Sequence, residues 1–99
     1  MTLAQHTIES LQAQMCGWRG LTEGEGNYTF YATENSTEVE VNVELRYYPP
    51  YGIYVKTFTI DAYTDGDEAK VDATQANEIE QFANELVKDY YYNIRECYD

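Results

Sequence analysis

Three features of this 99-residue chain could do chemistry: one histidine, two cysteines and a short acidic turn. His6 has no partner at the spacing of a metal site or of a catalytic triad, and we interpret it as a surface residue. Cys16 and Cys97 lie near opposite ends of the chain in no zinc-binding pattern, and we expect both to be small buried apolar residues. A disulfide between them is the alternative, which a reducing compartment disfavours.

The acidic turn, Asp65-Gly66-Asp67-Glu68, resembles a fragment of a calcium-binding loop. Such a loop needs an oxygen ligand at its fifth position, where this chain has Ala69, so a solvated turn is the better interpretation. The sequence contains no motif of a serine hydrolase, a nucleotide-binding loop or a zinc protease. Its many carboxylates form no pattern that selects a glycosidase-like pair. We therefore expect no enzymatic activity, no cofactor and no bound metal.

A row of carboxylates is the most regular pattern in the chain. In residues 37–52, TEVEVNVELRYYPPYG, every second residue from Val39 to Leu45 is apolar, and acidic or polar residues lie between them. Because alternate side chains of a strand point to opposite faces, this alternation predicts a core face and a face that bears Glu38, Glu40 and Glu44. A two-residue step along a strand is about 6.6 Å, comparable to the spacing of phosphates along one nucleic-acid strand.

The net charge restricts the class of partner. Eighteen acidic residues against six basic ones give a formal charge of −12 at pH 7. Direct binding to DNA, RNA or an anionic membrane is disfavoured, because phosphate groups are bound by clustered Lys and Arg. Basic proteins, including those that hold nucleic acid, are the favoured partners. A protein that is acidic only for solubility is the alternative.

Tyrosine is the second unusual component, with eleven copies against three phenylalanines. Its ring and hydroxyl suit both core edges and protein interfaces, and three tyrosines follow the carboxylate row. The candidate partner-binding set joins these rings to the row and to the acidic turn, and comprises Glu38, Glu40, Glu44, Tyr47, Tyr48, Tyr51, Asp65, Asp67 and Glu68. The alternative is a solvated face that prevents aggregation through sheet edges.

Helices are predicted at both ends of the chain. Thr2 and Gln5 fit a capping box, apolar residues follow at helical spacing, and Gly17 is suited to end the first helix. Trp18, just beyond, is expected to pack back on the core. The last helix, of about twenty residues, is capped by Asp72 or Thr74. Its apolar stripe comprises Ile79, Phe82, Ala83, Leu86, Tyr90 and Ile94.

Strands are predicted between the helices, over residues 27–33, 37–48 and 53–63. In the third strand the apolar residues change parity between Val55 and Phe58, which indicates a bulge or a strand covered on both sides. PPYG, residues 49–52, is predicted to reverse the chain. After the acidic turn, residues 69–72 form either a short fourth strand or a direct connection to the last helix.

Short connections between successive strands predict an antiparallel meander, and the row of glutamates indicates that one face of it stays in water. Both helices then pack on the side of Val39, Val41, Val43 and Leu45. We therefore predict a single domain, residues 1–99, of the α+β class. It has two layers, with an antiparallel sheet of three or four strands, N- and C-terminal helices on one face, and the order α-β-β-β-(β)-α.

The small size, acidity, tyrosine content and α+β pattern resemble those of phage-encoded anti-CRISPR and anti-restriction proteins that mimic DNA. The stretches that carry the resemblance are TEVEVNVELRYYPPYG and DAYTDGDEAKVD, and the likeness is one of type, with no shared motif. The resemblance implies binding to the basic nucleic-acid channel of a Cas effector, which blocks guide or target DNA. Inhibitors of this kind that lock a conformation or force dimerisation are the alternative to mimicry.

Two other classes of function are compatible with the same sequence. An immunity protein that neutralises a basic nuclease toxin would use the same electrostatic attraction. A structural subunit would use its tyrosines in a permanent interface, and the chain could be a monomer or a homodimer. The N-terminus lacks a signal-peptide pattern and no apolar run reaches about 18 residues, so we expect a cytoplasmic protein, in the host cell if phage-encoded.

Overall fold

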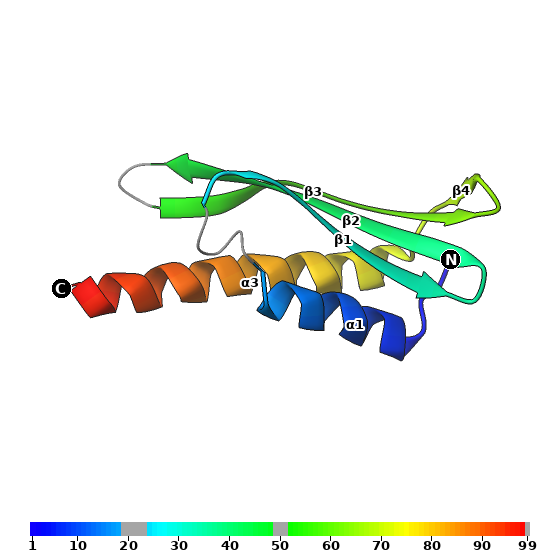
Figure 1. Ribbon diagram of the computed structural model, residues 1–99, viewed down its shortest axis with the longest axis horizontal. Coiled ribbons are helices and arrows are strands. Elements are labelled where there is room, and N and C mark those ends of the chain that lie inside the picture. Colours follow the sequence, from blue (N-terminus) through cyan, green and yellow to red (C-terminus); the bar gives the residue numbers. More distant parts are fainter. Residues whose placement is uncertain (19–23, 49–51, 99) are drawn as a thin grey trace.

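The computed structural model describes residues 1–18, 24–48 and 52–98, with side chains described as far as Asp89 except that of Tyr48. Within these ranges the order of elements is α1 (Gln5–Cys16), β1 (Gly26–Glu34), β2 (Thr37–Tyr48), β3 (Gly52–Thr64), β4 (Asp67–Ala69) and α3 (Ala73–Tyr98). The strands form one antiparallel sheet in the order β1-β2-β3-β4. Figure 1 shows this sheet as one layer and both helices as the other, on the same side of the sheet. The predicted two-layer α+β fold is confirmed.

The core lies between the sheet and the helices, and β2 supplies its centre. Val39, Val41, Val43 and Leu45 are at most 1% exposed, as their alternation predicts. The helices contribute the residues that meet them: Ile8, Leu11 and Met15 from α1, and Ile79, Ala83 and Val87 from α3. Helix α1 packs against β1 and α3 against β3, so the two strands that flank β2 each pack against a different helix. Of the predicted apolar stripe, Tyr90 and Ile94 lie outside the described side chains.

A β-bulge in β3 explains its change of parity. Glu44 is opposite Thr57 and Leu45 is opposite Val55, so Lys56 is the additional residue. The bulge lets Val55 on one side of it and Phe58 on the other both lie against the core. The predicted bulge is confirmed.

The acidic turn is shorter than predicted, because the chain reverses within two residues. Asp65 has φ +51° and Gly66 φ +86°, and positive φ at both central positions is the signature of a type I′ hairpin turn. Asp67 and Glu68 therefore belong to β4 and not to the turn. A fourth strand does form, but over residues 67–69. The predicted turn at residues 49–52 falls mostly on residues outside the described ranges.

The predicted capping box of the first helix is wrong. The N-cap is Ala4, whose backbone is extended, and no side-chain hydrogen bond of its own caps the helix. Glu34, at the end of β1, takes this role: its Oε1 accepts the Ala4 N–H at 2.6 Å and the Thr7 hydroxyl at 2.7 Å. These bonds hold the pKa of Glu34 below its usual value of 4.5, with the backbone N–H as the main cause. A carboxylate 30 residues away thus anchors the start of α1.

The ends of the helices otherwise follow the sequence. Asp72 caps α3, since its Oδ1 accepts the N–H of Thr74 at 3.0 Å and of Gln75 at 3.2 Å. The Gln75 side chain bonds both the N–H and the carbonyl of Leu3, which ties the start of α3 to the segment before α1. Gly17 ends α1 as predicted.

Two residues at the end of α1 differ in burial: Trp18 is buried and Cys16 is exposed. Trp18 packs on the core as predicted, with its ring edge-to-face against Tyr28 at 5.5 Å and against Phe30 at 5.3 Å. Cys16 is exposed and free, so the prediction of a buried thiol is wrong for it. The buried face of α1 is formed by Ile8, Leu11 and Met15, and Cys16 is turned away from that face. The side chain of Cys97 lies outside the described residues.

We expect Val41→Asp to lower the free energy of unfolding by about 3 kcal/mol or more, because it buries a charge without a partner. Glu40→Lys, on the next residue and the opposite face, is the matched control. It should not lower the free energy of unfolding, since Glu40 is a half-buried side chain on the face away from the core and a lysine there lies opposite Asp61 of β3. Urea unfolding of both variants measures this. Equal destabilisation by the two would contradict a sheet with one buried face.

The low pKa of Glu34 predicts a dependence of stability on pH. A carboxylate whose pKa is lower in the folded state stabilises the fold above pH 4.5, and this contribution is lost as the pH falls through the folded pKa. Wild type should therefore be more stable than Glu34→Gln near neutral pH, and the difference should vanish in acid. Thermal unfolding from neutral pH down to acid tests this, with Glu9→Gln, an exposed carboxylate of α1, as control. A constant difference across the range would show that ionisation of Glu34 is irrelevant.

Candidate functional site

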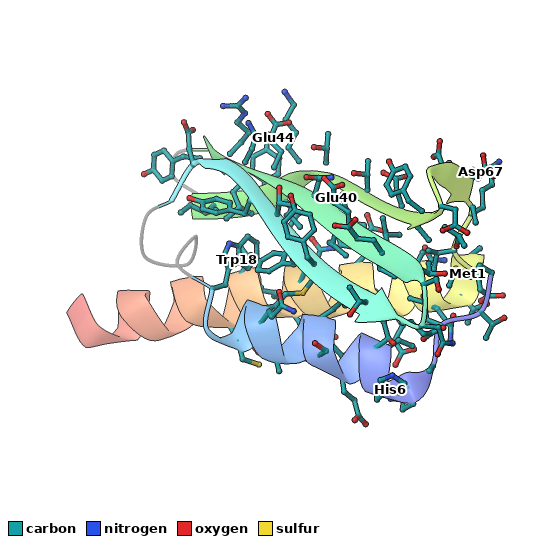
Figure 2. The ribbon with its side chains drawn as sticks, turned by 45° about the vertical axis from the view of Figure 1, so that its right-hand side comes forward. Met1, His6, Trp18, Glu40, Glu44 and Asp67 are labelled. Carbon is teal, nitrogen blue, oxygen red and sulfur yellow. The ribbon has the colours of Figure 1, made fainter. Side chains whose placement is uncertain are left out.

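The face of the sheet opposite the helices is the candidate site, and we call it the open face. Strand pairing places on it Asn27, Thr29, Tyr31 and Thr33 of β1, Glu38, Glu40, Asn42 and Glu44 of β2, Thr57, Thr59, Asp61 and Tyr63 of β3, and Glu68 of β4. Figure 2 shows Glu40 and Glu44 on the side of the sheet away from both helices. The open face is thus a continuous surface of polar, acidic and tyrosine side chains.

Carboxylates of three strands converge at one end of the open face. Glu40 of β2 is directly opposite Asp61 of β3, Glu38 is opposite Tyr63, and Tyr63 is in turn opposite Glu68 of β4. We call Glu38, Glu40, Asp61 and Glu68 the acidic end. Like charges directly across an antiparallel pair destabilise it, so the pairing of Glu40 with Asp61 costs the sheet stability.

Tyr63 reports the electrostatic potential of this end. Its pKa is raised above the usual value of 10.0, first by partial burial and then by the charges of Asp61, Glu68 and Glu40. Burial and negative charge both disfavour the phenolate, so the ring keeps its proton and its hydroxyl can donate. The acidic end therefore combines carboxylate acceptors with an aromatic ring.

A chain of hydrogen bonds orients Glu40. The Thr29 hydroxyl donates to Asn42 Oδ1 at 2.7 Å, and the Asn42 amide donates to Glu40 Oε1 at 3.1 Å. Asn42, which interrupts the glutamate row of the sequence, thus bridges β1 to the acidic end. The Glu40 carboxylate is held in place while its second oxygen stays available to a partner.

Glu44, at the other end of the row, is in a different environment. It forms an ion pair with Arg46 on the same strand and also accepts the Thr57 hydroxyl at 3.3 Å. Its charge is therefore compensated within the chain, whereas no ion pair is found at the acidic end among the described residues. The row of glutamates is one line in the sequence but two electrostatic environments in the fold.

The predicted partner-binding residues do not form a single surface. Glu38, Glu40 and Glu68 come together at the acidic end, as described above. Asp65 lies exposed in the β3–β4 turn and Asp67 lies exposed at the start of β4, both beside that end, where Figure 2 marks Asp67. Tyr47 shares the parity of Leu45, which places it on the helix side of the sheet, although its side chain is 53% exposed. The side chain of Tyr48 and the whole of Tyr51 lie outside the described residues.

Three residues of the open face are absent from the predicted partner-binding set: Tyr31, Asp61 and Tyr63. Tyr31 is 52% exposed and lies opposite Glu40 on β1. The two-residue connection Asn35-Ser36 gives a signal for this pairing, because counting back from it places residue 31 opposite residue 40. Asp61 and Tyr63 offer no such signal, since the bulge at Lys56 changes the count between β2 and β3.

Comparison of the chain with protein-family models, with curated proteins and with solved structures found no match. Among the residues that the structure describes, no group of three or more His, Cys, Asp or Glu side chains is placed to hold a metal ion. Within the same ranges, neither helix combines the length and the apolar composition needed to cross a bilayer.

We expect Asp61→Asn and Glu68→Gln each to lower the pKa of Tyr63, because each removes a negative charge that opposes the phenolate. Asp89→Asn on α3 removes the same charge from an exposed site on the helical layer and should leave the pKa of Tyr63 unchanged. NMR titration of ring-labelled tyrosine measures the pKa, and added salt should reduce the effect. A Tyr63 pKa that is insensitive to Asp61 and Glu68 would contradict a shared acidic end.

Proposed function

We propose that this protein is a phage-type anti-CRISPR inhibitor that binds the basic nucleic-acid-binding surface of a Cas effector. The acidic end is its contact surface, and DNA or guide RNA is excluded because the protein occupies the same cationic groups. The observation that carries the proposal is the pairing of Glu40 with Asp61, with no cation beside them among the described residues.

Charges of the same sign that lie side by side lower the stability of a fold. Their presence on the surface therefore favours a role in binding. The chain does supply a cation to Glu44, through Arg46, but supplies none among the described residues to the acidic end. A sheet selected only for stability would place opposite charges across strands, where each pair contributes about 0.2–1 kcal/mol. Arginines or lysines of a basic partner would relieve the repulsion, and the same charges would steer the encounter.

The spacing of the carboxylates supports competition with nucleic acid. Glu38 and Glu40 are one two-residue step apart, about 6.6 Å along the strand, and neighbouring strands are about 4.8 Å apart. This arrangement presents negative charges at intervals comparable to those of phosphates, on a surface whose acceptors are fixed by the sheet. Cationic side chains spaced to bind a phosphate backbone can therefore bind these carboxylates.

Tyrosine rings supply the contact energy that surface charge lacks. Tyr31 is 52% exposed next to Glu40, and Tyr63 lies among the acids. Tyrosine is enriched among the residues that dominate binding energy, and its hydroxyl can bond to a polar groove. We therefore expect charge to govern the association rate and the tyrosines to govern the dissociation rate.

Binding of labelled target DNA to purified, guide-loaded Cas effectors tests the proposal by fluorescence anisotropy. With a susceptible effector, saturating protein should prevent DNA binding. The double variant Glu40→Lys/Asp61→Lys should need at least about tenfold more protein for half-inhibition, and its association rate should depend less on salt. Tyr31→Ala should mainly speed dissociation.

Glu9→Lys/Glu85→Lys is the matched control, because it changes the net charge equally on exposed positions of the two helices. It should inhibit as well as wild type. Equal weakening by both double variants would show that only the total charge matters. Simultaneous binding of protein and DNA with unchanged affinities would exclude competition. Inhibition of a basic nuclease toxin, and of no Cas effector, would instead support the immunity-protein alternative.

A further inference from the structure

Among the described residues, the outer edge of β1 is the less protected of the two edges of the sheet. Counting back along β1 from its two-residue connection to β2, the backbone groups alternate. The N–H and carbonyl of one residue bond to β2, and those of the next residue point away from it. Glu34 and Thr37 flank that connection, so the outward backbone groups belong to Asn27, Thr29, Tyr31 and Thr33. The bond from Gln14 Nε2 to the Tyr31 carbonyl, at 2.7 Å, shows that this carbonyl does point outward.

Proteins protect long edge strands with charges, bulges or prolines, and the opposite side of the sheet shows such protection. Strand β4 pairs only with Ala62–Thr64, and the remainder of β3 carries a bulge with Lys56 and the charge of Asp61. Strand β1 has an unbroken register with β2 and no charged residue before Glu34. Its outward edge is covered at one described point only, by Gln14.

We propose that two copies of this chain associate through their β1 edges, antiparallel, into a continuous eight-stranded sheet. An antiparallel pair of identical edges is self-complementary about a two-fold axis, because each supplies N–H groups and carbonyls in turn. With the axis at Phe30, the Thr29 N–H of one copy bonds to the Tyr31 carbonyl of the other. That carbonyl has two lone pairs and can accept this bond beside that of Gln14.

The charge distribution selects a second copy as the occupant of this edge. Residues 26–33 are uncharged in a protein whose net charge is −12, so this is the line along which two copies approach with least repulsion. The carboxylate of Glu34, at the end of the strand, is already bonded to Ala4 and Thr7. A basic partner gains no charge interaction at β1 and is drawn instead to the acidic end.

The association adds a contact between the two copies on the open face. Tyr31 is 52% exposed in one copy, and in the paired sheet its ring lies beside Thr29 of the other copy as a cross-strand neighbour. The acidic ends stay apart, because β2, β3 and β4 lie successively farther from the axis, by about 4.8 Å per strand.

Sedimentation velocity from micromolar to millimolar protein tests the proposal. We expect a monomer–dimer equilibrium that salt strengthens, because screening reduces the repulsion between two acidic copies. Salt would weaken the binding of a basic partner, so the two proposals fail or succeed separately. A wild type that is monomeric at all concentrations and salts overturns the dimer.

Thr29→Pro is the diagnostic variant. It removes an outward N–H and leaves the pairing of β1 with β2 intact, since proline is tolerated on such edges. Thr29→Val is the control: both variants lose the hydroxyl that bonds Asn42, but only proline loses the N–H. We expect Thr29→Pro to dimerise at least tenfold more weakly than wild type, and Thr29→Val to dimerise as strongly as wild type. Dimerisation of the proline variant at the wild-type level overturns the proposal.

Hydrogen exchange on the wild-type protein is a second test of the interface and needs no variant. The amides of Thr29 and Tyr31 should become protected as the protein concentration rises, whereas outward amides of a monomer exchange rapidly. Dimerisation without protection of these amides would place the interface elsewhere and overturn the proposal.

Discussion

The burial of one face of β2 is the constraint on which the structure depends. Its valines and Leu45 lie between the two neighbouring strands, on the face that both helices cover, so β2 supplies the centre of the core. A slip of one residue in its pairing would move Glu40 into that core and Val41 into water. The cost of burying a carboxylate makes such a slip prohibitive. The register that buries the valines is therefore also the register that arranges the acids on the open face.

This coupling explains how the sheet tolerates repulsion at the acidic end. A like-charge pair across strands costs up to about 1 kcal/mol, whereas burying one valine side chain contributes about 1.5 kcal/mol or more. Val41 lies between Glu40 and Asn42 in the chain and is completely buried, so its contribution outweighs the repulsion of Glu40 by Asp61. The same sheet that fixes the acids in place thus supplies the energy to keep them together, with no ion pair to them among the described residues.

The helices are positioned by polar contacts between parts of the chain that are far apart in sequence. Glu34 anchors the start of α1 from the end of β1, and Gln75 ties Leu3 to the start of α3 through two bonds. Both helices are thereby held at the same end of the sheet, the end at which β3 turns into β4. The acidic end lies on the opposite face of this well-anchored region, which makes it a rigid surface for recognition.

The sequence by itself determined the fold class and the buried face of β2, because these follow from side-chain alternation. It also located the change of parity in β3, for which a bulge was one of two explanations. It further predicted that α1 ends at Gly17 and limited the cap of α3 to Asp72 or Thr74, since these features are local. The tertiary structure alone decided that Glu34 anchors α1 and that Asp61 faces Glu40. Each of these depends on strand register or on contacts between distant segments. Local periodicity places a side chain on a face, but only pairing across strands decides which charge lies beside it.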